Sequence, residues 1–205
     1  MPGGRTNTWS PWTTRKEGAN DGMDIPTGEL QELSLFSGYG GFTLACRLAG
    51  LRTRTVCYVE NDKYAQRVLQ QRFGDGLDEA PIWDDIKTFD PGPWRGHVDI
   101  VTAGFPCQPH SQAGARRIAK GLDDDRDLWP QTREVIRVVR PKYAVLENVP
   151  GIIFGNGGRQ PYGISVLGDL SELGFSDIRW GIYSAADAGA PHLRKRWWVL
   201  AHADT

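Results

Sequence analysis

The sequence predicts an α/β protein with a mostly parallel sheet and helices on both faces. From Leu30 onward, short apolar runs alternate with longer amphipathic stretches, which is typical of a sheet built from strand–helix–strand units. Hydrophobic residues make up 40% and charged residues 24%, as in an ordinary folded protein. The 205 residues suffice for one domain with a substantial core and are few for two.

Six segments have the short, apolar character of buried strands. In chain order they are 32–36, 55–59, 98–103, 143–146, 178–182 and 197–201. Between the first two lies GGFTLACRLAG, where apolar residues recur at helical spacing until Gly50 ends the turn. These three elements form one βαβ unit.

Two further helices are expected along the chain. One covers 128–139 and tolerates Pro130 because this residue falls in the first turn. The other covers 163–173 and ends at Gly174. Residues 1–29 bury too little apolar surface to offset the entropy of ordering. We therefore expect a poorly ordered tail over 1–29 and one folded domain over 30–205.

Charge and cysteine content limit the class of protein. The net charge of −1 and pI near 6.4 exclude a polycation that would coat nucleic acid, so any such contact must be local. The three widely spaced cysteines suit a reducing compartment and form neither a disulfide framework nor a zinc site. There is no apolar stretch of membrane-spanning length and no signal-peptide core. We expect a cytoplasmic protein without a membrane contact or a metal.

The first predicted strand ends in LFSGYGGF, whose glycines permit a tight turn and close approach of a ligand. A dinucleotide fingerprint on Gly38 and Gly40 requires a third glycine where Thr43 stands, so the match is incomplete. Glu60 ends the next strand 22 residues after Gly38, near the spacing at which a carboxylate binds a ribose diol. Asp85 is placed to accept a hydrogen bond from an adenine amino group. A ribose-containing cofactor is indicated, although glycines and acids also end strands in any α/β protein.

The motif GFPCQPHS places Cys107 just after a strand, where ligands gather in open parallel sheets. Pro106 makes the turn rigid, so a thiolate there is a candidate nucleophile. Glu147 ends the next strand and brings a carboxyl group to the same edge. Partial burial would raise its pKa and let it share or donate a proton near neutrality. We interpret Cys46 and Cys57 as inert core residues.

Six motifs occur in order between residues 35 and 201: LFSGYGGF, VENDKYA, DDI, GFPCQPHS, ENV and GAPHLRKRWWVLA. This series resembles the DNA (cytosine-5) methyltransferases. Each motif alone is weak, but PCQ followed by ENV and an R-x-R strand is highly specific. Ser34 stands where an aspartate commonly begins the first motif, and His192 replaces the usual glutamine. The resemblance implies a Rossmann-like, S-adenosylmethionine-dependent methyltransferase fold.

The resemblance also implies a reaction, in which a methyl group passes from S-adenosylmethionine to C5 of cytosine in DNA. The Cys107 thiolate would attack C6 and thereby make C5 nucleophilic enough to accept the methyl group. Glu147 would hydrogen-bond or protonate N3, and Arg196 would hold O2. Loss of the C5 proton would then expel the cysteine. In a duplex the target base must first be flipped out of the stack.

Further contacts follow from the same resemblance. The cofactor-binding residues it implies are Phe36, Gly38, Gly40, Glu60, Asn61, Asp85, Ile86 and Pro106. Asn61 stands where many relatives place an aromatic residue against the adenine. The DNA-binding residues it implies are Gln108, Ser111, Arg116, Arg117 and Arg194. Arg116 and Arg117 belong to a basic, glycine-containing loop suited to closing over phosphates. Strand alternation would place Arg194 and Arg196 on one face.

Family members continue beyond the arginine strand into a target-recognition region, which we expect this chain to lack. The chain would then be a catalytic-region fragment, a truncated gene product, or half of a split enzyme whose second chain supplies that region. Three alternatives stay open. A nicotinamide-dependent oxidoreductase would use the same glycine turn, but it leaves PCQ and ENV unexplained. In the second alternative, the chain is a noncatalytic remnant or one half of a split methyltransferase. C5-methylation of tRNA is the third alternative.

Overall fold

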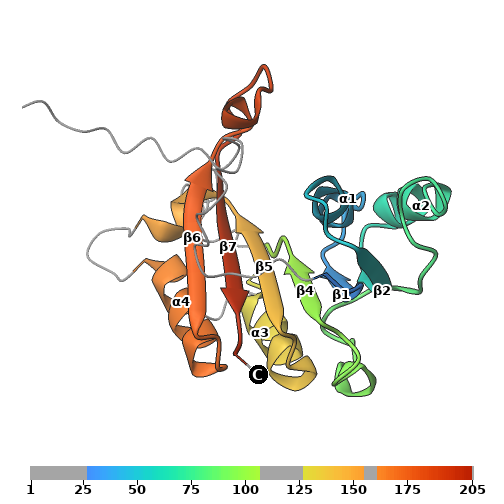
Figure 1. The fold of residues 1–205 in the computed structure, drawn as a ribbon, viewed down its shortest axis with the longest axis horizontal. Coiled ribbons are helices and arrows are strands. Elements are labelled where there is room, and N and C mark those ends of the chain that lie inside the picture. Colours follow the sequence, from blue (N-terminus) through green and yellow to red (C-terminus); the bar gives the residue numbers. More distant parts are fainter. Residues whose placement is uncertain (1–26, 107–126, 155–160, 205) are drawn as a thin grey trace, which may run out of the picture.

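The computed structural model describes residues 27–106, 127–154 and 161–204. Within these ranges one seven-stranded sheet has the order β3-β2-β1-β4-β5-β7-β6 (Figure 1). The strands are β1 (Leu30–Leu35), β2 (Thr53–Val59), β3 (Ile82–Trp83), β4 (Ile100–Ala103), β5 (Tyr143–Asn148), β6 (Asp177–Tyr183) and β7 (Arg196–His202). The first five strands in spatial order are parallel, and β7 runs antiparallel to both of its neighbours. The prediction of a mostly parallel sheet is confirmed.

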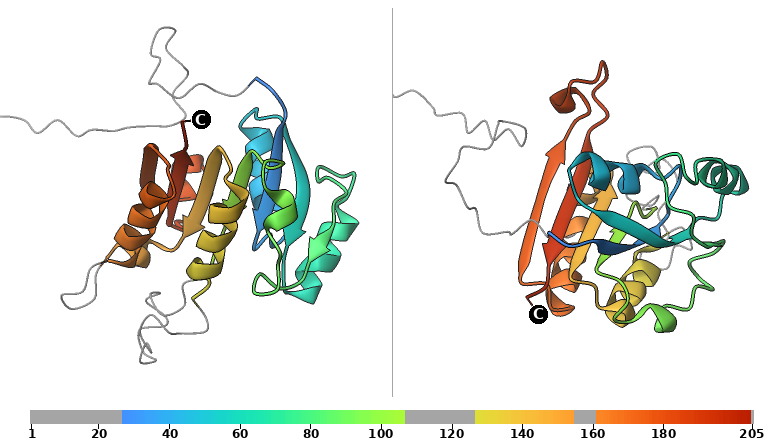
Figure 2. Two further views of the ribbon diagram at one scale, coloured as in Figure 1. Left: turned by 90° about the horizontal axis from the view of Figure 1, so that it is seen from below. Right: turned by 45° about the vertical axis from the view of Figure 1, so that its right-hand side comes forward.

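Helices cover both faces of the sheet, as predicted. They are α1 (Gly41–Leu48), α2 (Lys63–Gln71), α3 (Trp129–Val139) and α4 (Tyr162–Glu172). In the described ranges there are also three short 3₁₀ helices, η1 (Gly92–Trp94), η4 (Pro150–Ile153) and η5 (Ala186–Ala188). Figure 2 shows α1 and α2 on one face and α3 and α4 on the other. In folds of this kind, ligands bind at the carboxyl ends of the strands.

Among the described α-helices, the nine-residue helix α2 is the one that the apolar pattern did not predict. Its sequence is KYAQRVLQQ, in which only Ala65 and Leu69 are buried. Two buried residues produce too weak a periodicity to distinguish a helix from a surface loop. Asp62 caps the start of the helix, and its side chain accepts hydrogen bonds from the N–H groups of Tyr64 and Ala65. Capping therefore marks this helix more clearly than its apolar residues do.

The core lies between the sheet and helices α3 and α4. Leu33 and Leu35 of β1 belong to one buried cluster with Ile136 of α3 and Leu170 of α4. On the opposite face, a smaller cluster around Tyr58 packs against α2. In β4 every residue is buried, whereas buried and half-buried residues alternate along β5 and β7. Close packing thus fixes the central strands most firmly.

The predicted tail falls almost wholly outside the described residues, since only 27–29 of it are described and these are exposed. The boundary between tail and domain stays a prediction. None of the helices in the described ranges is long and apolar enough to cross a membrane. Within the same ranges no group of His, Cys, Asp or Glu side chains is arranged to hold a metal ion.

Candidate active site

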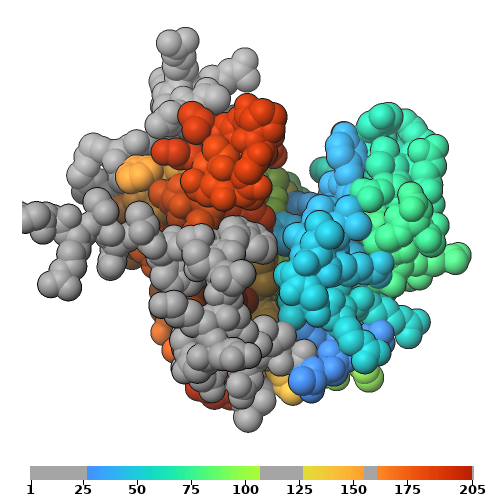
Figure 3. Space-filling model, turned by 45° about the horizontal axis from the view of Figure 1, so that its top comes forward, coloured from blue at the N-terminus to red at the C-terminus, as the bar shows by residue number. Residues whose placement is uncertain are grey.

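Strand register brings four chain segments to one edge of the sheet. Leu35 at the end of β1 pairs with Val59 of β2 and with Ala103 of β4. Ala103 in turn pairs with Leu146 of β5. The residues that follow these positions therefore meet at the carboxyl ends of parallel strands, where open α/β sheets bind ligands. In Figure 3, which looks onto this edge, the orange-red hairpin between β6 and β7 and the cyan segment of α1 stand on either side of a hollow.

The turn after β1 has a left-handed backbone at several residues. Gly38 has φ 54° and Gly40 has φ 79°, and Gly40 caps the start of α1. A Cβ atom on Gly40 would lie 2.6 Å from Leu77 Cδ1, whereas a Cβ on Gly38 would meet nothing within 4 Å. Gly40 is therefore required both by its conformation and by the lack of space, and Gly38 by conformation alone.

Glu60 joins the turns that follow β1 and β2. Its Oε2 accepts a hydrogen bond of 2.7 Å from the N–H of Gly38, and its Oε1 accepts one of 2.8 Å from the N–H of Asp62. The residue is 9% exposed. Each carboxylate oxygen has a second lone pair, so contact with ligand hydroxyls stays open. The spacing argument predicted a ligand contact for Glu60 and missed this link between the turns.

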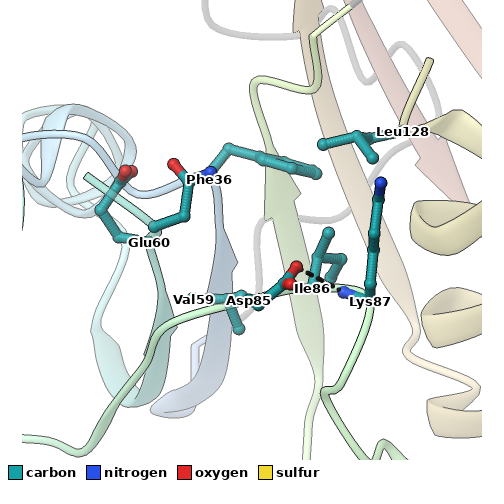
Figure 4. Close-up of a pocket in the computed structure, with 8 residues that line it drawn as sticks. Phe36, Val59, Glu60, Asp85, Ile86, Lys87 and Leu128 are labelled. Atoms are coloured by element: carbon teal, nitrogen blue, oxygen red, sulfur yellow. Dashed lines mark hydrogen bonds between the residues drawn. The ribbon is translucent and has the colours of Figure 1, made fainter. Parts of the chain in front are cut away.

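A pocket of about 210 Å³ opens beside these turns. Its lining residues are Phe36, Val59, Glu60, Asn61, Asp85, Ile86, Lys87 and Leu128. In Figure 4 the ring of Phe36 extends toward Leu128, and the side chain of Lys87 rises beside Ile86. The Asp85 carboxylate accepts a hydrogen bond of 2.9 Å from the N–H of Lys87. The pocket thus combines two carboxylates, an aromatic ring and aliphatic side chains.

The structure gathers most of the predicted cofactor residues around this pocket. Those that line it are Phe36, Glu60, Asn61, Asp85 and Ile86. Gly38 and Gly40 shape the adjacent turn, and Pro106 is not among the lining residues. Sequence reasoning missed Val59, Lys87 and Leu128, of which Leu128 comes from the start of α3, far along the chain. Binding roles for all of these residues stay predictions.

Glu147, near the end of β5, provides a carboxyl group at the same edge of the sheet. Its Oε1 lies 2.6 Å from Arg196 Nε, and each of the two side chains is 23% exposed. Burial raises the pKa of Glu147, while the charges of Arg196 and Arg194 oppose that rise. A Cβ on Gly104 would lie 3.5 Å from Glu147 Oε2. The carboxyl group therefore lies close to the segment that follows β4.

Asn148 connects the ends of β4 and β5. Its buried Nδ2 donates a hydrogen bond of 2.9 Å to the carbonyl oxygen of Phe105, and its Oδ1 accepts one of 2.8 Å from the N–H of Val149. Phe105 directly precedes Pro106, so the amide of Asn148 holds the backbone that leads into Cys107. Within the motif ENV, the sequence predicted a role only for the glutamate. The contact that the asparagine makes was not predicted.

The structure changes the explanation for the two arginines. Strand β7 begins at Arg196, and Arg194 precedes it with φ 31°, so strand alternation does not place them together. That expectation was wrong because the backbone turns before the strand begins. Both guanidinium groups nevertheless lower the pKa of Glu147.

Five predicted residues lie outside the described ranges, namely Cys107, Gln108, Ser111, Arg116 and Arg117. Cys46 and Cys57 are buried, and burial raises the pKa of Cys46 to about 12 and that of Cys57 to about 11. These thiols are unreactive at neutral pH. Near Glu147, the rings of Phe42 and Trp198 pack edge to face, with 5.7 Å between the ring centroids. The motifs did not indicate this contact.

Comparison with known proteins agrees with this geometry. The family model for C-5 cytosine-specific DNA methylase matches residues 30–205. The chain belongs to this family. The chain is 35% identical over 173 residues to the type II methyltransferase M.NgoBI of Neisseria gonorrhoeae, in an alignment that covers 84% of this chain and 50% of the relative. It is 33% identical over 177 residues to M.PspPI of a Psychrobacter strain, covering 83% and 39%.

Solved structures show the same fold for the methylase chain. The Dnmt2 methyltransferase of S. pombe superimposes with a TM-score of 0.65 at 23% identity, over 87% of this chain and 51% of that one. The methyltransferase EhMeth of Entamoeba histolytica has a TM-score of 0.68 at 17% identity, over 87% and 54%. The prediction of a Rossmann-like methyltransferase fold is confirmed. The chain spans about half the length of the relatives it matches.

Proposed function

We propose that this chain transfers a methyl group from S-adenosylmethionine to C5 of cytosine in double-stranded DNA, through a covalent bond between Cys107 and C6. The main support is the Glu147–Arg196 pair, which lies beside the segment that leads into Cys107. The pocket lies at the same edge of the sheet. Family membership and the relatives named type II methyltransferases support this reaction class. A cytoplasmic location belongs to the same proposal.

The carboxylates and apolar side chains that line the pocket fit a nucleoside cofactor. Glu60 offers carboxylate lone pairs to the ribose hydroxyls, and Asp85 offers its carboxylate to the adenine amino group. Phe36, Ile86 and Leu128 supply the apolar surface on which a purine ring packs. S-adenosylmethionine, when bound, supplies the electrophilic methyl group. Asn61 offers an amide instead of an aromatic ring, so we expect adenine stacking to depend on Phe36.

The protein's own groups then act on the flipped base. The Cys107 thiolate forms a bond to C6, and electron density moves through C5 toward N3. Glu147, whose pKa is raised by burial, gives N3 a proton or a hydrogen bond as this charge develops. Arg196 holds Glu147 and presents its guanidinium to O2. After C5 takes the methyl group, a base from solvent removes the C5 proton, the C5–C6 double bond re-forms as the bond from Cys107 to C6 breaks, and N3 returns any proton it received to Glu147.

A direct test uses duplex DNA in which 5-fluorocytosine replaces cytosine. Fluorine at C5 cannot leave as a proton does, so a covalent enzyme–DNA adduct accumulates when S-adenosylmethionine is present. We expect an adduct that survives denaturing electrophoresis with the wild-type chain and none with Cys107→Ser. Tritium transfer to ordinary DNA and to tRNA separates the two substrates. Transfer to tRNA with none to DNA would overturn the DNA assignment.

Because the chain spans half of its relatives, the assay is run with and without the C-terminal half of M.NgoBI supplied in trans. We expect the cofactor to bind in both cases, since the pocket is made by described residues. Absence of S-adenosylmethionine binding by calorimetry would contradict the cofactor assignment. Binding without any transfer, even with the added half, would favour a noncatalytic remnant.

A further inference from the structure

Glu32 is a fully buried carboxyl group in the middle of β1. Its exposed fraction is 0%. Three threonine hydroxyls donate hydrogen bonds of 2.8 Å to it: Thr43 and Thr55 to Oε2, and Thr102 to Oε1. Burying a carboxyl group without such partners is unfavourable, because the group loses its hydrogen bonds to water. The three hydroxyls therefore make this position tolerable.

The three donors come from different parts of the fold. Thr55 lies in β2 and Thr102 in β4, the two strands that flank β1. Thr43 lies in α1 and is itself fully buried, so its hydrogen bond crosses from the helix layer to the sheet. Ser34, also in β1, does not donate a hydrogen bond to Glu32, because its buried Oγ has no hydrogen-bond partner among the described residues.

Thr43 also occupies the position at which a dinucleotide fingerprint has its third glycine. A glycine there lets a helix pack closely on the first strand. Here the side chain of Thr43 fills the space and donates its hydroxyl proton to Glu32, while its hydroxyl oxygen lies 3.1 Å from that of Thr55. A directional polar contact thus replaces close backbone approach as the link between α1 and β1.

The start of α1 is continuous with the glycine turn beside the pocket. Gly40 caps the helix, and the N–H of Gly38 bonds to Glu60, which lines the pocket together with Phe36. A shift of α1 relative to the sheet therefore moves the turn and the wall of the pocket. We propose that Glu32 is a positioning residue, which acts through Thr43 to hold the glycine turn in the conformation that binds the cofactor. The binding part of this inference rests on the proposed function.

Two isosteric variants separate positioning from stability. Thr43→Val removes the hydrogen bond from α1, and Thr102→Val removes one donor to the same carboxyl group without touching α1. Both variants lose a buried hydrogen bond, so both should unfold at comparably lower temperature. Only Thr43→Val should weaken S-adenosylmethionine binding, by about 10-fold. Thr43→Ser keeps the hydroxyl and should restore affinity to within about threefold of wild type.

Hydrogen exchange without any ligand provides the readout that does not depend on the proposed function. Amides of residues 36–41 should exchange faster in Thr43→Val than in Thr102→Val at a temperature where both are folded. Equal exchange and equal affinity in the two variants would overturn the inference. If Thr43→Val does not fold, Thr43→Ala is compared in the same way. Failure of the wild type to bind S-adenosylmethionine would refute the proposed function, while the exchange comparison would still decide the role of Glu32.

Discussion

The two sides of the strand edge hold their carboxylates in different ways. Glu60, on the side of β1 and β2, accepts hydrogen bonds from two backbone N–H groups. Glu147, on the side of β5 and β7, is held by the long side chain of Arg196. Backbone donors cannot move unless the fold moves, whereas a guanidinium can leave through side-chain rotation alone. We infer that the pocket side is formed in advance and that the Glu147 side rearranges when a base enters.

The packing beneath each side agrees with this difference. On the pocket side, five of the six residues of β1 and five of the seven residues of β2 are buried. Along β5 and β7, buried residues alternate with half-buried ones, so one face of these strands is only partly covered. Tight packing on both faces makes local movement costly, and an uncovered face lowers that cost. Substitutions on the two sides should therefore affect different measurements.

The largest effect is expected for the nucleophile. Cys107→Ser replaces a partly ionised thiol with a hydroxyl that is hardly ionised at neutral pH, so methyl transfer should fall by about 10³-fold or more. The measurement is tritium transfer to DNA. Cys57→Ser is the control, because Cys57 is buried and its pKa is raised to about 11. Near-normal turnover of Cys107→Ser would exclude the covalent mechanism.

The next effect compares the two carboxylates directly. Glu147→Gln keeps the shape of the side chain but cannot deliver a proton, so turnover should fall by about 10²- to 10⁴-fold with little change in cofactor affinity. Glu60→Gln brings an amide NH₂ against backbone N–H donors, so we expect cofactor affinity to fall by about 10-fold. Calorimetry and steady-state kinetics on both variants test this. Equal losses of affinity would place Glu147 in the cofactor pocket and remove the contrast.

A smaller effect tests how rigid the glycine turn is. Gly40→Ala should lower the free energy of unfolding by about 2–4 kcal/mol, because φ is 79° and the new Cβ would collide with Leu77. Gly38→Ala should cost only about 1 kcal/mol, since its φ is 54° but the space beside it is open. Urea unfolding of both variants measures the difference. Equal costs would mean that Leu77 moves aside freely.

The smallest effect is the pH dependence that Glu147 confers on stability. Burial raises its pKa in the folded protein, so the folded state holds this proton more tightly than the unfolded chain does. The contribution is favourable below the ordinary pKa of 4.5 and is lost as pH rises through the raised folded value. Wild type should therefore lose stability relative to Glu147→Gln as pH rises from about 4 toward neutrality. Parallel curves for the two proteins would contradict the raised pKa.

Local patterns in the sequence predicted most elements within two residues of their observed bounds. Helix α3 was expected at 128–139 and spans Trp129–Val139, and a strand expected at 55–59 is β2, Thr53–Val59. Such patterns succeed because periodicity and strand ends are properties of neighbouring residues. The order of the last strands was not predictable in this way. Strand β7 inserts between β5 and β6, and only pairing between distant segments decides that arrangement.

The motifs alone drew Phe36, Glu60, Asp85 and Glu147 into the predicted site, because each lies at or just after the end of a short apolar segment that is visible in the chain. Tertiary structure decided which groups these residues meet. Arg196 reaches Glu147 because β7 runs antiparallel to β5, which puts the start of one strand beside the end of the other. Asn148 reaches Phe105 across 43 positions of sequence, through the parallel pairing of β4 and β5. Contacts of this kind depend on strand pairing over long separations, which no local pattern of residues specifies.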